Sequence, residues 1–167
     1  MLTSSHAFVA YLLCRKSEVK VWKYAVLGSV LPDVLMLFKY LYLFIITLSS
    51  GVLASDLIHE QIHQISFVQI YGLIFHSVFL WLFLAFLGIF YKRKFFYAFV
   101  IGGVSHVVTD FLTHRGQWAW NHLYPLDIAP IDGLVRFTDL AFMIPINILW
   151  LLIFVPKLWS YLKRSNF

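Results

Sequence analysis

One segment near the middle of the chain carries three side chains of the kinds that bind metal ions. Within residues 102–116, His106, Asp110 and His114 follow one another at intervals of four residues. Side chains four residues apart lie on the same face of an α-helix, so these three are expected to form one stripe on a single helix. Neutral imidazole and carboxylate groups are typical zinc ligands. The pattern favours a metal site; the alternative is a polar stripe that only pairs with neighbouring helices.

The composition of the chain is typical of an integral membrane protein. Of 167 residues, 61% are hydrophobic and only 13% are charged, and the mean hydropathy is +0.81. In soluble domains about a quarter of the residues are charged. We expect one all-α domain over residues 1–167. The net charge of +5 does not indicate a nucleic-acid partner, because the basic residues gather at the ends of the apolar segments.

Four apolar segments are long enough to cross a bilayer, and a fifth is too short. The long segments are residues 24–48, 66–90, 95–113 and 139–159. Residues 3–14 are too few to span and are expected to form an N-terminal half-helix. The predicted fold is therefore an integral membrane helical bundle with four transmembrane helices and a short N-terminal half-helix.

The basic residues predict how this bundle is oriented. Ten of the thirteen lie within residues 15–23, 92–94 and 157–164, which fall on one side if the spans alternate. The positive-inside rule makes that side cytoplasmic. We therefore expect a multi-pass protein of the cell membrane, with its C-terminus in the cytoplasm and the loops 49–65 and 114–138 outside.

Ligand-type side chains on separate segments are predicted to share one depth. With a helical rise of about 1.5 Å per residue, His6, Asp33 and His106 lie about 14–17 Å from the cytoplasmic ends of their segments. By the same measure His76 and Asp110 lie at about 22 Å. An isolated charge in hydrocarbon costs several kcal/mol, so these groups should meet one another or a cation. A shared metal site is favoured over a purely structural polar cluster.

The order of these motifs resembles that of the YdjM-like membrane-bound metal-dependent hydrolases. The matching motifs are His6, Leu31-Pro32-Asp33, His76-Ser77, Ser105-His106 with Asp110, and Tyr124-Pro125. The chain departs from that pattern after Asp33, where residues 34–36 lack an Asp and a His, and at Tyr71, where a His is common.

The same order is similar to the ligand order of zinc-dependent phospholipase C and the related single-strand nucleases, which are all-helical. This resemblance implies that Asp33, His76, His106 and Asp110 hold one metal ion. His6 and the shared Asp110 would hold a second ion, and His114 and His122 could serve a third. The implied cofactor is one or two divalent ions, with zinc favoured.

Such a site suits hydrolysis of a phosphoester. A bound zinc ion lowers the pKa of water to near 7, and a carboxylate can orient or deprotonate that water. We expect Asp33 to be both a metal ligand and the catalytic base. Arg115 follows the stripe and could bind a phosphate through its guanidinium fork, or serve only as an anchor at the membrane interface. The location and the resemblance together suggest a lipid head group as the substrate.

Two other classes of function remain open. His59, Glu60 and His63 match the His-Glu-x-x-His motif, in which two zinc ligands lie one turn apart and Glu is the base of a protease. These residues fall in an expected polar loop, where a solvated turn is the ordinary explanation. The third class is a non-enzymatic transporter or assembly protein that uses the polar cluster as an ion relay. Four spans with no repeated half leave little room for alternating access.

Overall fold

The computed structural model describes residues 3–16, 21–38, 41–42, 45, 66–116, 119–136 and 139–165, and these residues form helices and loops without a strand. The all-α prediction is therefore confirmed for the described part of the chain. The helices, in chain order, are α1 (Thr3–Cys14), α2 (Val21–Val30), the short 3₁₀ helix η1 (Leu31–Asp33), α5 (Ser66–Phe75), α6 (Val78–Tyr91), α7 (Lys94–Thr113) and α8 (Leu140–Ser165).

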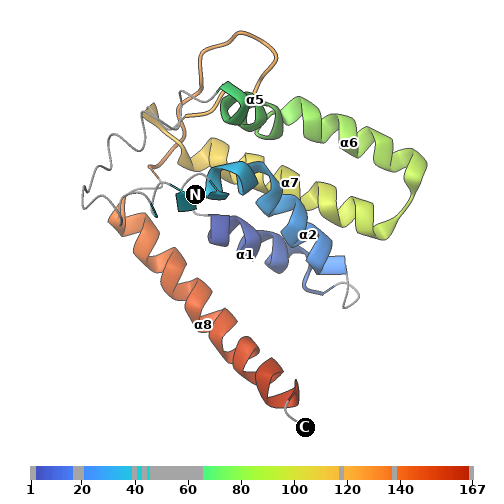
Figure 1. Ribbon diagram of the computed structural model, residues 1–167, viewed down its shortest axis with the longest axis vertical. Helices are drawn as coiled ribbons and strands as arrows, with labels where there is room; N and C mark the ends of the chain where they lie inside the picture. The colour runs from blue at the N-terminus through green and yellow to red at the C-terminus, as the bar shows by residue number, and fades with distance from the viewer. Residues whose placement is uncertain are drawn as a thin grey trace.

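Helix α7 is the centre of the bundle, with α1 and α2 on one side and α6 on the other (Figure 1). Helix α8 extends away from the other helices and contacts α1. The polar cluster described below lies where α1 begins and where α2, α5 and α7 end. The sequence predicted the bounds of α1 correctly, as a helix too short to span.

The backbones of α2 and α7 lie in direct contact because small residues line the facing sides of both helices. A Cβ atom added at Gly28 would collide with the backbone carbonyl of Phe99, and one added at Gly102 would collide with that of Ala25. Small residues of this kind let two helix backbones approach closely. On the opposite side of α7, the fully buried Trp81 of α6 lies over Gly103, where a Cβ atom would meet its ring.

Helix α2 does not continue regularly into residues 34–38. Pro32 lies in the 3₁₀ turn of η1, and the N–H of Val34 bonds to the carbonyl of Leu31. Proline lacks the N–H that an α-helix needs, so a local tightening at this point is expected. The backbone carbonyls of residues 29 and 31 also accept hydrogen bonds from side chains of other helices, His106 and Tyr71 respectively.

The segment 66–90, predicted as a single span, is broken into two helices. Helices α5 and α6 meet at His76 and Ser77 with a bend of 54°. Ser77 has an extended backbone (φ −76°, ψ 130°) and caps α6, accepting a hydrogen bond from the N–H of Phe79 at 3.2 Å. Serine is a favoured N-cap because its hydroxyl satisfies a free N–H of the first turn. Nothing in the hydropathy of residues 66–90 predicts this break.

The number of helices that could cross a membrane is smaller than predicted. Among the described residues, Val21–Phe38 and Lys94–Thr113 are long and apolar enough, and the bent pair α5–α6 makes a third if it is counted as one span. The fourth expected span lies in α8, which contains Pro145 and Pro156. There only Ile144–Ile153 qualifies, as a shorter apolar helix. The structure thus supports two or three spanning helices in place of four.

Candidate metal centre

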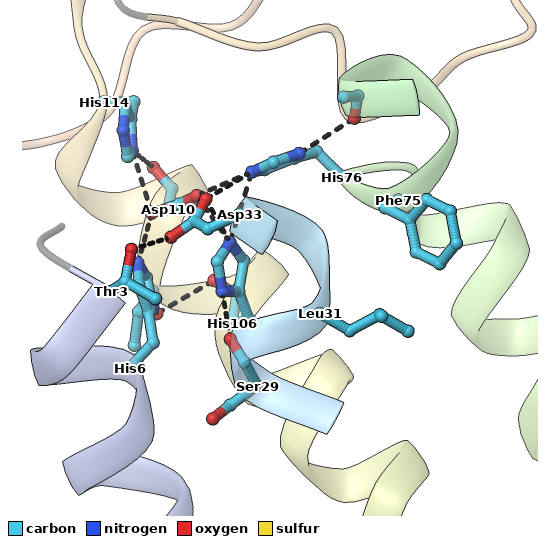
Figure 2. A network of polar contacts seen from close by, with 12 residues as sticks. Thr3, His6, Ser29, Leu31, Asp33, Phe75, His76, His106, Asp110 and His114 are labelled. Carbon is cyan, nitrogen blue, oxygen red and sulfur yellow. Dashed lines mark hydrogen bonds and ion pairs between the residues drawn. The ribbon is translucent and has the colours of Figure 1, made fainter. Parts of the chain in front are cut away.

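Five buried or nearly buried side chains from four parts of the chain converge on one point (Figure 2). His6 comes from α1, Asp33 from η1, His76 from the break between α5 and α6, and His106 and Asp110 from α7. Taken as whole residues, His6, His76, His106 and Asp110 are each at most 1% exposed. The convergence predicted from the common depth of these side chains is confirmed by their positions.

One oxygen of Asp110 faces a group of three other ligand atoms. Asp110 Oδ2 lies 3.0 Å from His106 Nε2 and 3.4 Å from His76 Nε2. Those two nitrogens are 3.2 Å apart. Asp33 Oδ1 lies 3.5 Å from His76 Nε2 and 3.7 Å from His106 Nε2. We call these four atoms the first subsite.

The other oxygen of Asp110 faces two further imidazoles. Asp110 Oδ1 lies 2.9 Å from His6 Nε2 and 3.0 Å from His114 Nδ1. We call these three atoms the second subsite. The stripe of His106, Asp110 and His114 was expected on one helix, but α7 ends at Thr113 and His114 is its extended C-cap (φ −101°, ψ 124°). His114 still reaches Asp110 because its own N–H bonds to the Asp110 carbonyl at 2.8 Å.

The hydrogen bonds behind the first subsite decide which imidazole nitrogen carries the proton. His106 Nδ1 lies 2.6 Å from the carbonyl of Ser29, and His76 Nδ1 lies 2.8 Å from the carbonyl of Gly72. A carbonyl only accepts, so both Nδ1 atoms donate. In the neutral ring, Nε2 then carries a lone pair. This is the arrangement of metal-binding histidines, whose second nitrogen donates to a carbonyl or carboxylate.

His6 in the second subsite is held in the same way by a hydroxyl group. The Thr109 hydroxyl lies 2.8 Å from the carbonyls of both Ser105 and His106 and 2.7 Å from His6 Nδ1. Because its single proton goes to a carbonyl, this hydroxyl accepts from His6 Nδ1. His6 Nε2 is buried without a hydrogen-bond partner and faces the Asp110 carboxylate.

Lone pairs of three Nε2 atoms and of the carboxylate oxygens thus point at one another inside a buried site, whereas His114 Nδ1 also lies 3.2 Å from the Asp110 backbone carbonyl. A proton on one Nε2 atom would serve only one or two of these contacts, whereas a divalent cation would serve all the atoms of a subsite. Ligand atoms within 4.8 Å of one another form two sets. His76, His106 and Asp110 belong to the first subsite, whereas His6, Asp33 and His106 join His6 of the second subsite to two ligands of the first. The donor set of imidazole and carboxylate suits zinc.

Replacing Thr109 with valine tests the support of the second subsite. Valine keeps the size of threonine but removes the acceptor of His6 Nδ1. Loss of an outer-shell partner typically weakens metal binding about 10–100-fold, and we expect that loss for the ion held by His6. Competition with a chelator measures it. Thr113→Val is the control, since that hydroxyl donates to the backbone of its own helix, at Thr109. Equal affinities in both variants would contradict the assignment.

Asp33 and Asp110 differ in their access to water. The side chain of Asp33 is 16% exposed and that of Asp110 only 2%. The hydroxyl of Thr3 donates to Asp33 Oδ2 at 2.6 Å and so fixes the carboxylate orientation. Of the two carboxylates, Asp33 is therefore the one that an incoming water or substrate can reach.

Arg115, the predicted phosphate ligand, lies outside the converging group. Its Nε is 3.8 Å from Asp132 Oδ2, and both side chains are more than half exposed. Asp132 also accepts a 2.7 Å hydrogen bond from the N–H of Gly116. The pairing places Arg115 on the exposed rim beyond the end of α7.

His122, which the resemblance suggested for a third metal, contacts the backbone of the α5–α6 break. Its Nδ1 donates to the carbonyl of His76 at 3.0 Å. Burial lowers the pKa of His122 below its ordinary value, since the charged ring would lose its water. The metal-ligand groups among the described residues include neither His122 nor His114, but of these two only His114 contacts Asp110 Oδ1, at 3.0 Å.

The sequence reasoning missed the groups that orient the histidines. These are the Thr3 and Thr109 hydroxyls and the carbonyls of Ser29 and Gly72. Only Thr109 left a signal, because it lies three residues after His106 and beside Asp110 on the same helix. The His59, Glu60 and His63 motif lies outside the described residues.

Comparison with known proteins agrees with this chemistry. No curated protein matches the chain, and no solved structure does. The profile of the family described as zinc dependent phospholipase C matches residues 4–140, which includes every residue of both subsites. The family and the buried group of histidines and aspartates together support a zinc cofactor. Since the match covers most of its length, the chain belongs to the zinc dependent phospholipase C family.

Proposed function

We propose that this protein is a membrane-embedded, zinc-dependent hydrolase that cleaves the phosphodiester of a phospholipid and releases its phosphorylated head group. One observation supports this most directly: the two oxygens of Asp110 face two separate sets of imidazole nitrogens inside a buried site. A shared carboxylate of this kind is suited to two neighbouring cations, which favour phosphodiester cleavage. The family description names the substrate class.

The ligand roles follow from the two subsites. Asp33, His76, His106 and Asp110 would hold the first ion. His6, His114 and the shared Asp110 would hold the second. When bound, zinc supplies a Lewis acid that lowers the pKa of water and polarises the phosphoryl oxygens.

Asp33 is proposed as both a ligand and the base. It is the more exposed of the two carboxylates, and its Oδ2 accepts a hydrogen bond from the Thr3 hydroxyl. In this role it orients the attacking water and accepts its proton as the oxygen bonds to phosphorus. The bond between phosphorus and the glycerol oxygen breaks, and this oxygen takes up a proton, passed on from Asp33 or from water, to leave as the diacylglycerol hydroxyl. Arg115 on the rim would bind a phosphate oxygen of the arriving lipid after exchanging Asp132 for it.

The outer surface of the described helices suits a lipid environment. Helix α6 carries five large apolar side chains that are each more than half exposed, namely Leu82, Phe83, Phe86, Ile89 and Phe90. An apolar surface of this extent marks a membrane or protein contact. We propose that α2, α7 and the bent pair α5–α6 lie in the bilayer. A cytoplasmic C-terminus, predicted from the basic residues, would require α8 to cross as well, and it stays a prediction, as does the narrower YdjM-like assignment.

Zinc-dependent release of a head group is the direct test. Purified protein in phosphatidylcholine–detergent micelles should release phosphocholine and diacylglycerol, lose this activity after chelation, and regain it with added zinc. Release of choline alone would indicate cleavage of the other phosphoester bond and contradict the proposal. Peptide hydrolysis that disappears in Glu60→Gln would favour the protease motif instead.

A further inference from the structure

The loop residues Trp120, His122 and Tyr124 lie directly against the break between α5 and α6. The carbonyl of His122 accepts a 2.9 Å hydrogen bond from the N–H of Val78. Its ring Nδ1 donates to the carbonyl of His76 at 3.0 Å. The Ser77 hydroxyl donates to the carbonyl of Tyr124. We call Trp120, His122 and Tyr124 the loop clasp.

His122 completes the hydrogen bonds that the break leaves open on both sides. The last carbonyls of a helix and the first N–H groups of the next have no partner within their own helix. His76 contributes such a carbonyl, at the end of α5, and Val78 such an N–H, at the start of α6. His122 binds both of these groups. It therefore joins the end of α5 to the start of α6, next to the residue that carries the His76 imidazole.

Trp120 holds the imidazole ring of His76 from its face. The two rings are stacked, with centroids 4.5 Å apart and planes at 9°. The indole fits there only because residue 72 is glycine: a Cβ atom at Gly72 would collide with the Trp120 ring. The carbonyl of the same Gly72 binds His76 Nδ1. The ring is therefore fixed both in its plane and across its face.

His76 needs this support more than His106 and Asp110 do. His106 and Asp110 project from consecutive turns of one regular helix, α7, which fixes their spacing. His76 lies between two helices that meet at 54°, where the regular helical hydrogen bonds are interrupted. Its Nε2 nevertheless lies 3.4 Å from Asp110 Oδ2 and 3.5 Å from Asp33 Oδ1.

We propose that His122 and Trp120 are positioning residues, which hold His76 in the orientation that binds metal in the first subsite. This inference rests on the proposed function only in requiring that the first subsite binds an ion. It assigns the 119–126 loop to the metal centre, with His122 acting through the backbone of His76 and not as a ligand.

Two substitutions of His122 separate this role from its alternatives. His122→Asn keeps a side-chain N–H near the position of Nδ1, whereas His122→Ala removes it. We expect His122→Ala to weaken zinc binding about 10–100-fold, the usual effect of losing an outer-shell partner, and His122→Asn to stay near wild type. The absorption spectrum of the cobalt-substituted protein should change only in the alanine variant.

Asn121→Ala is the matched control. The Asn121 side chain makes its hydrogen bonds within the loop, donating to the carbonyl of Leu126 and accepting from the N–H of Leu123. It should leave both the zinc affinity and the cobalt spectrum unchanged. If His122→Ala fails to fold, Trp120→Leu against Trp120→Phe gives the same comparison, because phenylalanine keeps an aromatic face on His76. Circular dichroism verifies folding in each case.

Three results would overturn the proposal. Wild-type affinity and spectrum in both His122→Ala and Trp120→Leu would show that the loop clasp does not orient His76. Loss of one whole zinc equivalent in both His122 variants, with unchanged affinity for the rest, would make His122 a ligand. An equal loss in Asn121→Ala would make the effect one of general loop stability. Failure of the wild-type protein to bind zinc would instead contradict the proposed function.

Discussion

Replacing Asp110 with asparagine should remove zinc from both subsites and abolish phospholipid hydrolysis. The substitution keeps the size of the side chain but removes its charge and turns one of its two acceptor oxygens into an N–H donor. Each oxygen of Asp110 faces an imidazole nitrogen within 3.0 Å, so one subsite loses its oxygen ligand and the other keeps only an uncharged amide oxygen. Since even an outer-shell partner contributes about 10–100-fold, we expect the affinity at each subsite to fall by more than about 100-fold.

Elemental analysis of the purified variant measures this directly, beside the hydrolysis assay. Asp127→Asn is the matched control, because it makes the same chemical change at an exposed loop position. It should keep both zinc and activity. An Asp110→Asn protein that retained its full zinc content would show that this carboxylate is not shared between ions. Retained zinc at one subsite alone would show that this subsite does not need the charge of the carboxylate.

Replacing Gly102 with valine should destabilise the bundle and empty the metal centre together. Any side chain at this position meets the backbone carbonyl of Ala25, which cannot move without α2. Overpacking a core typically costs about 1–3 kcal/mol, and an immovable backbone atom places this case at or above about 3 kcal/mol. Helix α2 leads to Asp33 and supplies the Ser29 carbonyl that binds His106, so its displacement disturbs the first subsite.

Thermal unfolding and zinc content are the two measurements for this variant. Gly88→Ala is the control, since the nearest atom to a Cβ there is in the Tyr97 ring, at 3.1 Å, and a side chain can shift. We expect a small change in Tm and full zinc content in that protein. A Gly102→Val variant with normal zinc content and a lowered Tm would show that the centre tolerates separation of α2 from α7.

The sequence predicted the members of the cluster because their positions obey simple geometry. His106 and Asp110 are four residues apart, and α7 is a regular helix up to Thr113, so the spacing specified a shared face. His6, Asp33 and His76 could be added because charged groups in apolar segments must find partners. The all-helical class followed from the composition in the same way.

The parts that failed depend on breaks and loops, which periodicity does not reveal. Residues 66–90 are apolar throughout, so the bend at His76 and Ser77 left no interruption in hydropathy. Trp120 stacks on His76 because of the path of its loop, which the sequence does not specify. Backbone carbonyls such as that of Ser29 have no sequence signature, because every residue has one. The number of spans was overestimated since length alone counted the proline-containing α8.

A carboxylate that serves two subsites also links their occupancies. An ion in either subsite would hold Asp110 in the orientation that the other subsite needs, and this preorganisation opposes the repulsion between two dications. Thermodynamic reciprocity requires that each ion change the affinity for its neighbour by the same factor. Zinc loading would then be cooperative whenever preorganisation outweighs repulsion, so the protein would pass from empty to doubly loaded within a narrow range of free zinc.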